Sequence, residues 1–295
     1  MKRLRIMIMV ILVLLFVFIV CPQENQVFGA EKRVLKMAFI PGGDLETELD
    51  LFGAIIENVS EQIDCPIELQ VATSYEAVVE ALRGKHLQLA RLGPFSYIIA
   101  RGLGIPIQPI VIENLIDKGT SYFSILIART DRHIKFAWRP EVVKNLTVAL
   151  CSPSSTSGGL IPQAEGLVHD PQITIDLWKE VLWSGSHNAS ILAVQHGNVD
   201  VAFVADRRLI AAIAKGLVKE DEIEILWQSG PIPNSPFVAL MDLETEMLMK
   251  LEWAFLHIPD ELLRKANLNR FEPASDSTYH YVYRIGEKYL KLKED

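Results

Sequence analysis

Short apolar runs alternate with segments of helical periodicity along the first third of the chain. Apolar runs of about six residues predict strands, and the longer amphipathic segments between them predict helices. The expected order is strand 34–40, helix 46–63, strand 67–72, helix 75–82, strand 87–92 and helix 97–103. This alternation is typical of a largely parallel α/β sheet.

A second series of the same kind follows. It predicts strands at 107–112, 122–127, 146–150, 180–183, 199–204 and 223–227, with helices at 160–168, 189–195 and 208–216. Pro231, Pro233 and Pro236 then interrupt the pattern. Because proline fixes φ and donates no backbone hydrogen bond, this connector is expected to be an extended crossover. The remaining segments, with a tyrosine-rich tail, are expected to pack back on the first series.

The predicted fold is therefore α/β with two lobes and a ligand cleft between them. We assign residues 30–120 and 231–295 to lobe 1 and residues 121–230 to lobe 2, with crossings near 119–124 and 229–235. In α/β folds, ligands bind beyond the carboxyl ends of strands, and two such lobes form a cleft there. Residues that directly follow expected strands are therefore the candidates for a ligand site.

The N-terminus, residues 1–29, has the pattern of a signal peptide. Basic residues precede an uncharged apolar run at 6–20, which is shorter than the roughly 20 residues that a membrane span needs. Cleavage after Gly29 fits the preference for small residues before the cut. Cys21 leaves two alternatives open, lipidation of its thiol and anchoring by an uncleaved segment. The protein is expected in the periplasm or tethered to the outside of the cytoplasmic membrane.

The charge of the chain excludes one class of partner. The formal net charge is −8, and losing three basic residues and Glu24 with the signal changes it to −10. Affinity for nucleic acid comes mostly from clustered Lys and Arg, so nucleic acid is a poor partner. A small anion stays possible if local dipoles make the site. After cleavage only Cys65 and Cys151 would remain, and the sequence leaves their pairing open.

A hydroxyl-rich turn is the most informative local motif. The sequence SSTSGG at 154–159 lies between the strand expected at 146–150 and the helix expected at 160–168. The first amides of a helix lack carbonyl partners, the helix dipole adds partial positive charge, and hydroxyls add uncharged donors. Such a turn suits a tetrahedral oxyanion such as phosphate or phosphonate. The same residue types are also ordinary helix caps, and this alternative stays open.

A second turn, WSGSHN at 183–188, also joins an expected strand to an expected helix. It places His187 at the helix start. A neutral imidazole donates one hydrogen bond and a protonated one donates two, and a bound dianion would favour the protonated form. A histidine in a turn is also commonly a surface or capping residue, and this alternative stays open as well.

Several motifs occur in a definite order along the chain. They are ATSY at 72–75, LGPFSY at 92–97, Tyr122 at a strand start, SSTSGG at 154–159, SGSH at 184–187, the run 199–206 and PIPNSP at 231–236. This order, over roughly residues 34–260, resembles the phosphate/phosphonate-type substrate-binding proteins of ABC importers. The resemblance implies a type II periplasmic binding protein fold that closes over phosphonate, phosphite or a related oxyanion and delivers it to a membrane permease.

The resemblance also maps a ligand site onto this chain. It places hydroxyl donors on Ser155, Thr156 and Ser157, an imidazole on His187, and phenolic donors from the other lobe on Tyr75 and Tyr122. These groups are uncharged or weakly charged, so no permanent counter-ion would hold the ligand. Each good charge-assisted hydrogen bond offsets about 1.5 to 3 kcal/mol of the cost of removing water from the anion.

Asp206 follows the strand expected at 199–204 and completes the set of candidates. Its carboxylate can accept a hydrogen bond from a protonated ligand oxygen or from a ligand amino group, or it can cap the helix that begins near Arg208. The chain departs from the family pattern at Ser152, where the family often has an acidic residue, and at Asn234 and Ser235 in the connector. A large cationic tail on the ligand is therefore less favoured.

Other functions are less well supported. Ser155, His187 and Asp206 follow one another as in a hydrolase triad, but the chain has no G-x-S-x-G elbow, and adjacent hydroxyls suit a cradle better than one activated nucleophile. We therefore do not expect an enzyme. Scattered histidines and incomplete glycine patterns argue against a metal or a cofactor. We expect a monomer, and the main alternative to transport is presentation of the anion to a membrane histidine kinase or chemoreceptor.

Overall fold

The computed structural model describes residues 33–40 and 45–294 of the chain. The expected signal segment 1–29, with Cys21 and Gly29, lies outside the described residues, so its processing stays a prediction. Residues from Val34 onward form one compact unit. Within the described ranges, no helix is both long enough and apolar enough to cross a bilayer.

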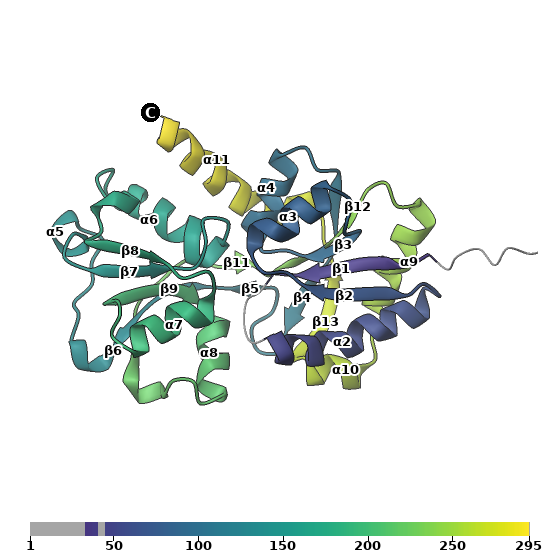
Figure 1. The fold of residues 1–295 in the computed structure, drawn as a ribbon, viewed down its shortest axis with the longest axis horizontal. Coiled ribbons are helices and arrows are strands. Elements are labelled where there is room, and N and C mark those ends of the chain that lie inside the picture. Colours follow the sequence, from purple (N-terminus) through teal and green to yellow (C-terminus); the bar gives the residue numbers. More distant parts are fainter. Residues whose placement is uncertain (1–32, 41–44, 295) are drawn as a thin grey trace, which may run out of the picture. The chain divides into compact units, whose positions relative to one another are not determined.

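The first lobe is built on a six-stranded sheet (Figure 1). Its strands lie in the order β13 (Leu268–Pro273), β4 (Ile107–Leu115), β12 (Pro236–Leu240), β3 (Leu89–Arg91), β1 (Leu35–Phe39) and β2 (Ile67–Val71). Its helices are α2 (Leu45–Gln62), α3 (Tyr75–Arg83), α4 (Pro94–Gly102), α9 (Thr245–Leu256) and α10 (Asp260–Lys265). Phe237 and Val238 are neighbours in β12 but belong to different apolar clusters. Side chains therefore point alternately to two covered faces of the sheet.

The second lobe is built on a five-stranded sheet. Its strands lie in the order β10 (Ile223–Gln228), β6 (Ser124–Arg129), β9 (Val201–Ala205), β7 (Thr147–Leu150) and β8 (Glu180–Trp183). Its helices are α5 (Pro140–Val143), α6 (Ile161–His169), α7 (His187–Gln195) and α8 (Asp206–Ala214), and the π-helical turn η2 (Thr156–Leu160) precedes α6. The short 3-10 turns are η1 (Thr130–Arg132), η3 (Ile175–Leu177), η4 (Glu220–Glu222) and, in the C-terminal region, η5 (Asp276–Tyr279). All five residues of β9 are buried, as expected for a strand in the middle of a sheet.

The expectation of largely parallel sheets is wrong in part, because both sheets are mixed. Strand β1 pairs in parallel with β2 and β3, and β7 pairs in parallel with β8 and β9. However, β12 is antiparallel to β3 and β4, β13 is antiparallel to β4, and β6 is antiparallel to β9 and β10. Strands β6 and β12 are the first that the chain enters after passing between the lobes. They therefore run away from the edge at which the parallel strands end.

Two short strands mark the passages between the lobes. β5 (Ser121–Tyr122) pairs antiparallel with β11 (Ile232–Pro233), and both lie between the two sheets in Figure 1. The expected extended conformation of the proline-rich connector is confirmed here. Asn234 fixes the connector, because its backbone N–H donates to the Thr120 carbonyl at 2.8 Å and its side-chain amide donates to the Gly119 carbonyl at 3.1 Å.

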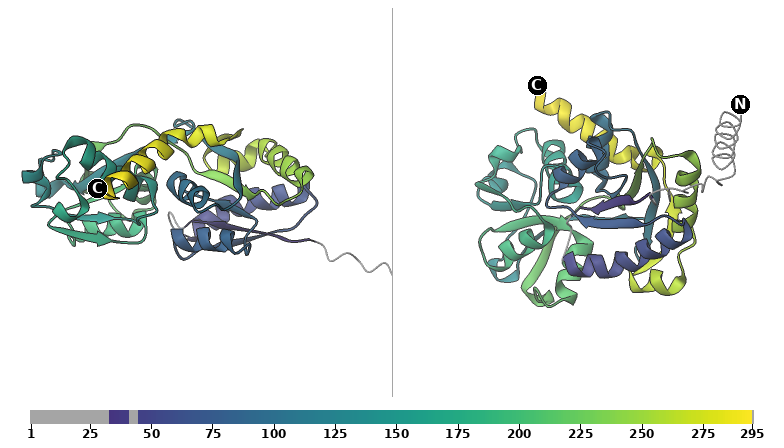
Figure 2. Two further views of the ribbon diagram at one scale, coloured as in Figure 1. Left: turned by 90° about the horizontal axis from the view of Figure 1, so that it is seen from above. Right: turned by 45° about the vertical axis from the view of Figure 1, so that its right-hand side comes forward.

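The C-terminal region contains elements that the apolar pattern did not predict. These are α10, the edge strand β13 and the helix α11 (His280–Glu294). As expected, the tail packs on the first lobe, where α11 contacts α4. It also contacts α6 of the second lobe, and Figure 2 shows it passing over both. A Cβ atom on Gly286 would lie 3.0 Å from the Phe95 ring and 3.9 Å from Leu160. This helix therefore joins the two lobes.

Candidate functional site

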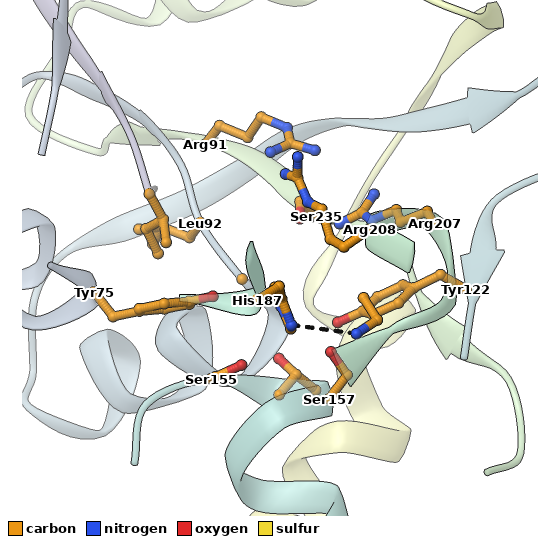
Figure 3. Close-up of a pocket in the computed structure, with 14 residues that line it drawn as sticks. Tyr75, Arg91, Leu92, Tyr122, Ser155, Ser157, His187, Arg207, Arg208 and Ser235 are labelled. Atoms are coloured by element: carbon orange, nitrogen blue, oxygen red, sulfur yellow. Dashed lines mark hydrogen bonds between the residues drawn. The ribbon is translucent and has the colours of Figure 1, made fainter. Parts of the chain in front are cut away.

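Residues from both lobes line one pocket (Figure 3). The first lobe and the connector contribute Ile40, Tyr75, Arg91, Leu92, Gly93 and Ser235, and the second lobe contributes Tyr122, Ser155, Thr156, Ser157, His187, Ala205, Arg207 and Arg208. The pocket holds about 390 Å³ of space, part of it open to solvent. Six of the seven predicted site residues are therefore brought together, and Asp206 is not among the lining residues.

Five helix starts surround this pocket. Helix α3 begins at Tyr75, α4 directly after Gly93, η2 directly after Ser155, α7 at His187 and α8 directly after Ala205. Each start leaves backbone N–H groups without helical partners and carries partial positive charge. Each of these helical segments follows a strand in the sequence, because β2, β3, β7, β8 and β9 precede α3, α4, η2, α7 and α8.

The hydroxyl-rich turn at 154–159, from here on the hydroxyl loop, both caps a helix and lines the pocket. The Ser155 side chain accepts a hydrogen bond from the Gly158 N–H at 3.2 Å, so the capping alternative holds for this residue. The Ser157 carbonyl accepts a bond from the Ser124 hydroxyl at 2.6 Å. The loop packs tightly against Cys151, because a Cβ atom on Gly158 would lie 2.3 Å from the Cys151 sulfur. The serine and threonine side chains are thereby held in the pocket wall.

The two phenols are buried donors. Tyr75 and Tyr122 are each 4% exposed. They were both expected from the lobe opposite the hydroxyl loop, but only Tyr75, in α3, belongs to the first lobe, whereas Tyr122 lies in β5, where the chain enters the second lobe. Burial raises the pKa of the Tyr75 phenol well above its ordinary value. Burial also raises the pKa of Tyr122, although the Arg207 guanidinium, 4.5 Å from the centre of its ring, opposes this shift. Both phenols therefore stay protonated and keep an O–H to donate.

The surroundings of His187 favour its neutral form, and the expectation that a bound dianion favours the protonated form stays a prediction. Its Nδ1 accepts a hydrogen bond from the Ala205 N–H at 3.2 Å, drawn as a dashed line in Figure 3, and lies 3.1 Å from the Cys151 sulfur. Burial, together with the positive charges of Arg208 and Arg207, lowers the pKa of His187 to about 3. The proton of the neutral ring is therefore on Nε2, which can donate one hydrogen bond.

Three arginines in the pocket wall correct the prediction that only uncharged or weakly charged donors face the ligand. Arg91 is the last residue of β3, and Arg207 and Arg208 lie in the first turn of α8. Arg91 ends a strand, and Arg207 and Arg208 come within three residues of the end of β9, which is the signal that could have identified them. The negative net charge of the chain obscured it, because net charge does not report the local charge of a buried site.

Glu113 lies behind two of these arginines. Its carboxylate, 1% exposed, accepts hydrogen bonds from Arg91 Nε at 2.5 Å and Nη2 at 2.9 Å, and from Arg207 Nη1 at 3.4 Å. Burial raises the pKa of Glu113, but the two guanidinium groups lower it more strongly, so it lies below its ordinary value. The carboxylate therefore stays ionised and holds Arg91 and Arg207 beside the pocket.

Asp206 does not line the pocket, and its carboxylate is bonded to other residues of the protein. It is the first residue of α8, after the N-cap Ala205, and its carboxylate accepts hydrogen bonds from the Phe123 N–H at 3.1 Å and from Lys118 Nζ at 2.9 Å. These bonds hold the start of β6 against α8. Contact between Asp206 and a ligand stays a prediction.

The open question about the cysteines has an answer in the structure. Cys65 and Cys151 are both buried, and they lie in different lobes. Cys151 packs beneath the hydroxyl loop, beside His187 and the Ser190 hydroxyl. The two residues therefore do not pair.

The fold and the site together define a two-lobed binding protein with a cationic pocket between its lobes. Comparison with known families agrees: the chain belongs to the periplasmic substrate-binding proteins of phosphonate ABC transporters, whose family model matches residues 37–279. The resemblance noted from the motif order is thereby confirmed.

Individual relatives support this placement. The chain is 28% identical over 261 residues to the phosphate-import protein PhnD of Mycolicibacterium smegmatis, covering 85% of this chain and 77% of that protein. It is also 24% identical over 276 residues to a probable ABC transporter phosphite binding protein, PhnD1, of Prochlorococcus marinus. This match covers 88% of this chain and 91% of that protein. The solved structure of PhnD1 in complex with methylphosphonate has the same fold, with a TM-score of 0.78 and 23% identity over 87% of this chain and 98% of that one.

Proposed function

We propose that this protein is the solute-binding component of an ABC importer, which captures a phosphonate, phosphite or phosphate-like oxyanion between its lobes and delivers it to a membrane permease. The observation that carries the proposal is the shared pocket, in which hydroxyl, phenol and imidazole donors from two lobes converge with three arginines. The family and the two relatives described above are named for transport, so transport is favoured over sensing.

The proposed ligand contacts are Tyr75, Tyr122, Ser155, Thr156, Ser157 and His187, with Arg208 added from the structure. Removing water from an anion is costly unless hydrogen bonds replace it. Each charge-assisted bond contributes about 1.5 to 3 kcal/mol, so several donors of this kind offset the loss. Asp206 is proposed as a ligand contact only for a longer ligand, whose amino group would donate a hydrogen bond to its carboxylate.

The arrangement of Ser155, His187 and Asp206, which follow one another as in a hydrolase triad, supports binding without catalysis. In a hydrolase, the carboxylate would bond to the histidine Nδ1 and orient it toward the serine. Here Nδ1 of His187 accepts from the Ala205 N–H, while the Asp206 carboxylate bonds to Phe123 and Lys118. The three residues do not form a relay, which supports a receptor in place of an enzyme.

We further propose the location and the lobe boundaries that the sequence suggests. The protein is exported by the segment 1–29, and it acts in the periplasm or tethered through Cys21. Residues 30–120 and 231–295 form one lobe and residues 121–230 form the other. The paired strands β5 and β11 support this division, because they lie where the chain passes between the two sheets.

Titration calorimetry tests the proposed function. The mature protein, from residue 30, is titrated with phosphate, phosphite, methylphosphonate and 2-aminoethylphosphonate, with sodium chloride of equal ionic strength as the control. One of the four oxyanions is expected to bind tightly with one site per chain. Absence of binding to all four, by a protein whose circular dichroism shows that it is folded, would contradict the proposal.

A further inference from the structure

We infer that Gly93 limits the size of the ligand, because its missing side chain leaves open a corner of the pocket between Tyr75 and Thr156. This inference rests on the proposed function and adds to it a residue that determines specificity. Gly93 lines the pocket between the end of β3 and the start of α4, directly after Leu92. Figure 3 shows Leu92 and Tyr75 at one side of the pocket.

The backbone conformation at this position does not require glycine. Gly93 has φ −66° and ψ 149°, in the extended region that every amino acid can adopt. A residue before a proline, here Pro94, prefers this region whatever its side chain. Gly93 is also the N-cap of α4, where it provides no side-chain hydrogen bond to the helix. A serine or an aspartate would cap this helix better than glycine does.

The packing around Gly93 does not require glycine either. Among the described residues, a Cβ atom at this position would lie 3.6 Å from Ser96 Oγ, 3.7 Å from Thr156 Oγ1 and 3.9 Å from Tyr75 Cε1. These are ordinary contact distances. In the hydroxyl loop, by contrast, a Cβ atom on Gly159 would lie 2.2 Å from a backbone carbonyl oxygen, so packing requires that glycine. Neither the backbone nor the packing therefore explains the glycine at position 93.

A side chain at position 93 would take space from the ligand. Tyr75 and Thr156 are proposed ligand contacts from different lobes, and the added Cβ atom would touch both. The space is small, because the centre of a water molecule can reach only about 30 Å³ of the pocket, and a single water needs about 10 to 15 Å³. In so small a space, an added methyl group excludes a large ligand more strongly than a small one. Gly93 therefore determines which substituent on phosphorus the pocket accepts.

The test is calorimetry of the mature wild type and of Gly93→Ala with phosphite, phosphate and methylphosphonate. The fourth substituent on phosphorus in these anions is a hydrogen atom, an oxygen atom and a methyl group, respectively. In Gly93→Ala, the affinity for methylphosphonate is expected to fall at least about tenfold relative to the affinity for phosphite. If the wild type binds only one of the three anions, the affinity for that anion is expected to fall at least about tenfold.

Gly102→Ala is the matched control. Gly102 is the last residue of α4, and among the described residues a Cβ atom there would have no neighbour within 4 Å. This variant is expected to bind the three anions as the wild type does. Thermal melts of the ligand-free proteins test whether the fold needs Gly93. Gly93→Ala should melt at the wild-type temperature or higher, because a compatible Gly→Ala change lowers the entropy of the unfolded chain.

The outcomes are distinguishable. Equal losses of affinity for all the anions that bind, or no loss, overturn this inference and leave the proposed function intact. A melting temperature of Gly93→Ala below those of the wild type and Gly102→Ala also overturns it, because the fold then requires the glycine. If 2-aminoethylphosphonate alone binds the wild type, only this inference fails, since the pocket then selects the largest substituent. If no oxyanion of the panel binds, the proposed function and this inference fail together.

Discussion

The backbone N–H of Phe95, in the first turn of α4, donates a hydrogen bond to the side-chain oxygen of Thr156 over 2.9 Å. Phe95 belongs to the first lobe and Thr156 to the hydroxyl loop of the second. A second bond of this kind runs from the Ser96 hydroxyl to the Ser154 carbonyl at 3.0 Å. The loop that lines the pocket thus also joins the two lobes.

Thr156→Val is expected to weaken oxyanion binding by about 1 to 3 kcal/mol, because it removes both a ligand donor and the acceptor for Phe95 with little change in volume. Because the buried Phe95 N–H loses its acceptor, the ligand-free protein should also be destabilised by about 1 to 3 kcal/mol. Calorimetry and thermal melts measure the two quantities. Thr174→Val, at an exposed threonine of the second lobe, serves as the control. Equal affinities for Thr156→Val and wild type would exclude a ligand role for this hydroxyl.

His187 makes the folded protein sensitive to acid. Its pKa is about 3 in the fold, and an unfolded histidine has a pKa of about 6.5. Between these values the unfolded chain binds a proton that the folded chain does not, so stability is lost as the pH falls from 6.5 toward 3. The contribution of this residue is at most about 1.4 kcal/mol per pH unit.

The measurement is urea unfolding of wild type and His187→Asn at several pH values. The carboxylates of the chain also titrate in this window, so the difference between the two proteins isolates His187. That difference should shrink as the pH falls below 6.5, since only the wild type loses the histidine contribution. A difference that is constant over the whole range would mean that the pKa of His187 is the same in the folded and unfolded chains, as for an exposed ring.

Gly158→Ala is expected to destabilise the protein by about 1 to 3 kcal/mol, because the new Cβ would lie 2.3 Å from the sulfur and 2.8 Å from the Cβ of Cys151. Urea unfolding measures the loss. Gly53→Ala is the matched control, since a Cβ atom on Gly53, in α2, would have no neighbour within 4 Å. In a helix interior this change should stabilise by up to about 1 kcal/mol. Similar effects at both sites would show that the hydroxyl loop can relax.

Cys65 and Cys151 should not react with Ellman's reagent while the protein is folded. They are 5% and 1% exposed, and burial raises the pKa of Cys151 to about 12, so little thiolate forms. Two thiols per mature chain should become reactive in denaturant without a reducing agent. Reaction of fewer than two under those conditions would indicate a disulfide or a modified cysteine.

Much of the fold can be predicted from local sequence patterns. The features that cannot be predicted in this way depend on tertiary structure. Strand and helix periodicity located most elements, and the ends of strands located the hydroxyl loop and His187. Strand direction depends on where the chain passes between the lobes, as at β6 and β12, and periodicity carries no such information. The amphipathic tail was noted for its tyrosines, and its contact with both lobes as α11 depends on tertiary packing.

The site residues likewise divide into those that the sequence could predict and those that only the folded structure identifies. Short side chains such as Ser155 and Ser157 act where their backbone lies, so their position after a strand was enough to place them. Arg207 reaches the pocket on a long side chain held by Ser235, Glu113 and the Tyr122 ring, which come from three other segments. Only the folded structure brings these partners together. The charge of the pocket was therefore the least predictable property of the site.

The most direct test of the central claim is a crystal structure of the protein grown with the oxyanion that binds tightest in calorimetry. The account predicts one tetrahedral anion in the pocket of Figure 3, with its oxygens within hydrogen-bond distance of the hydroxyl loop, of His187 Nε2 and of Arg208. An anion bound elsewhere, or a pocket in which Ser157 and His187 point away from the anion, would contradict it.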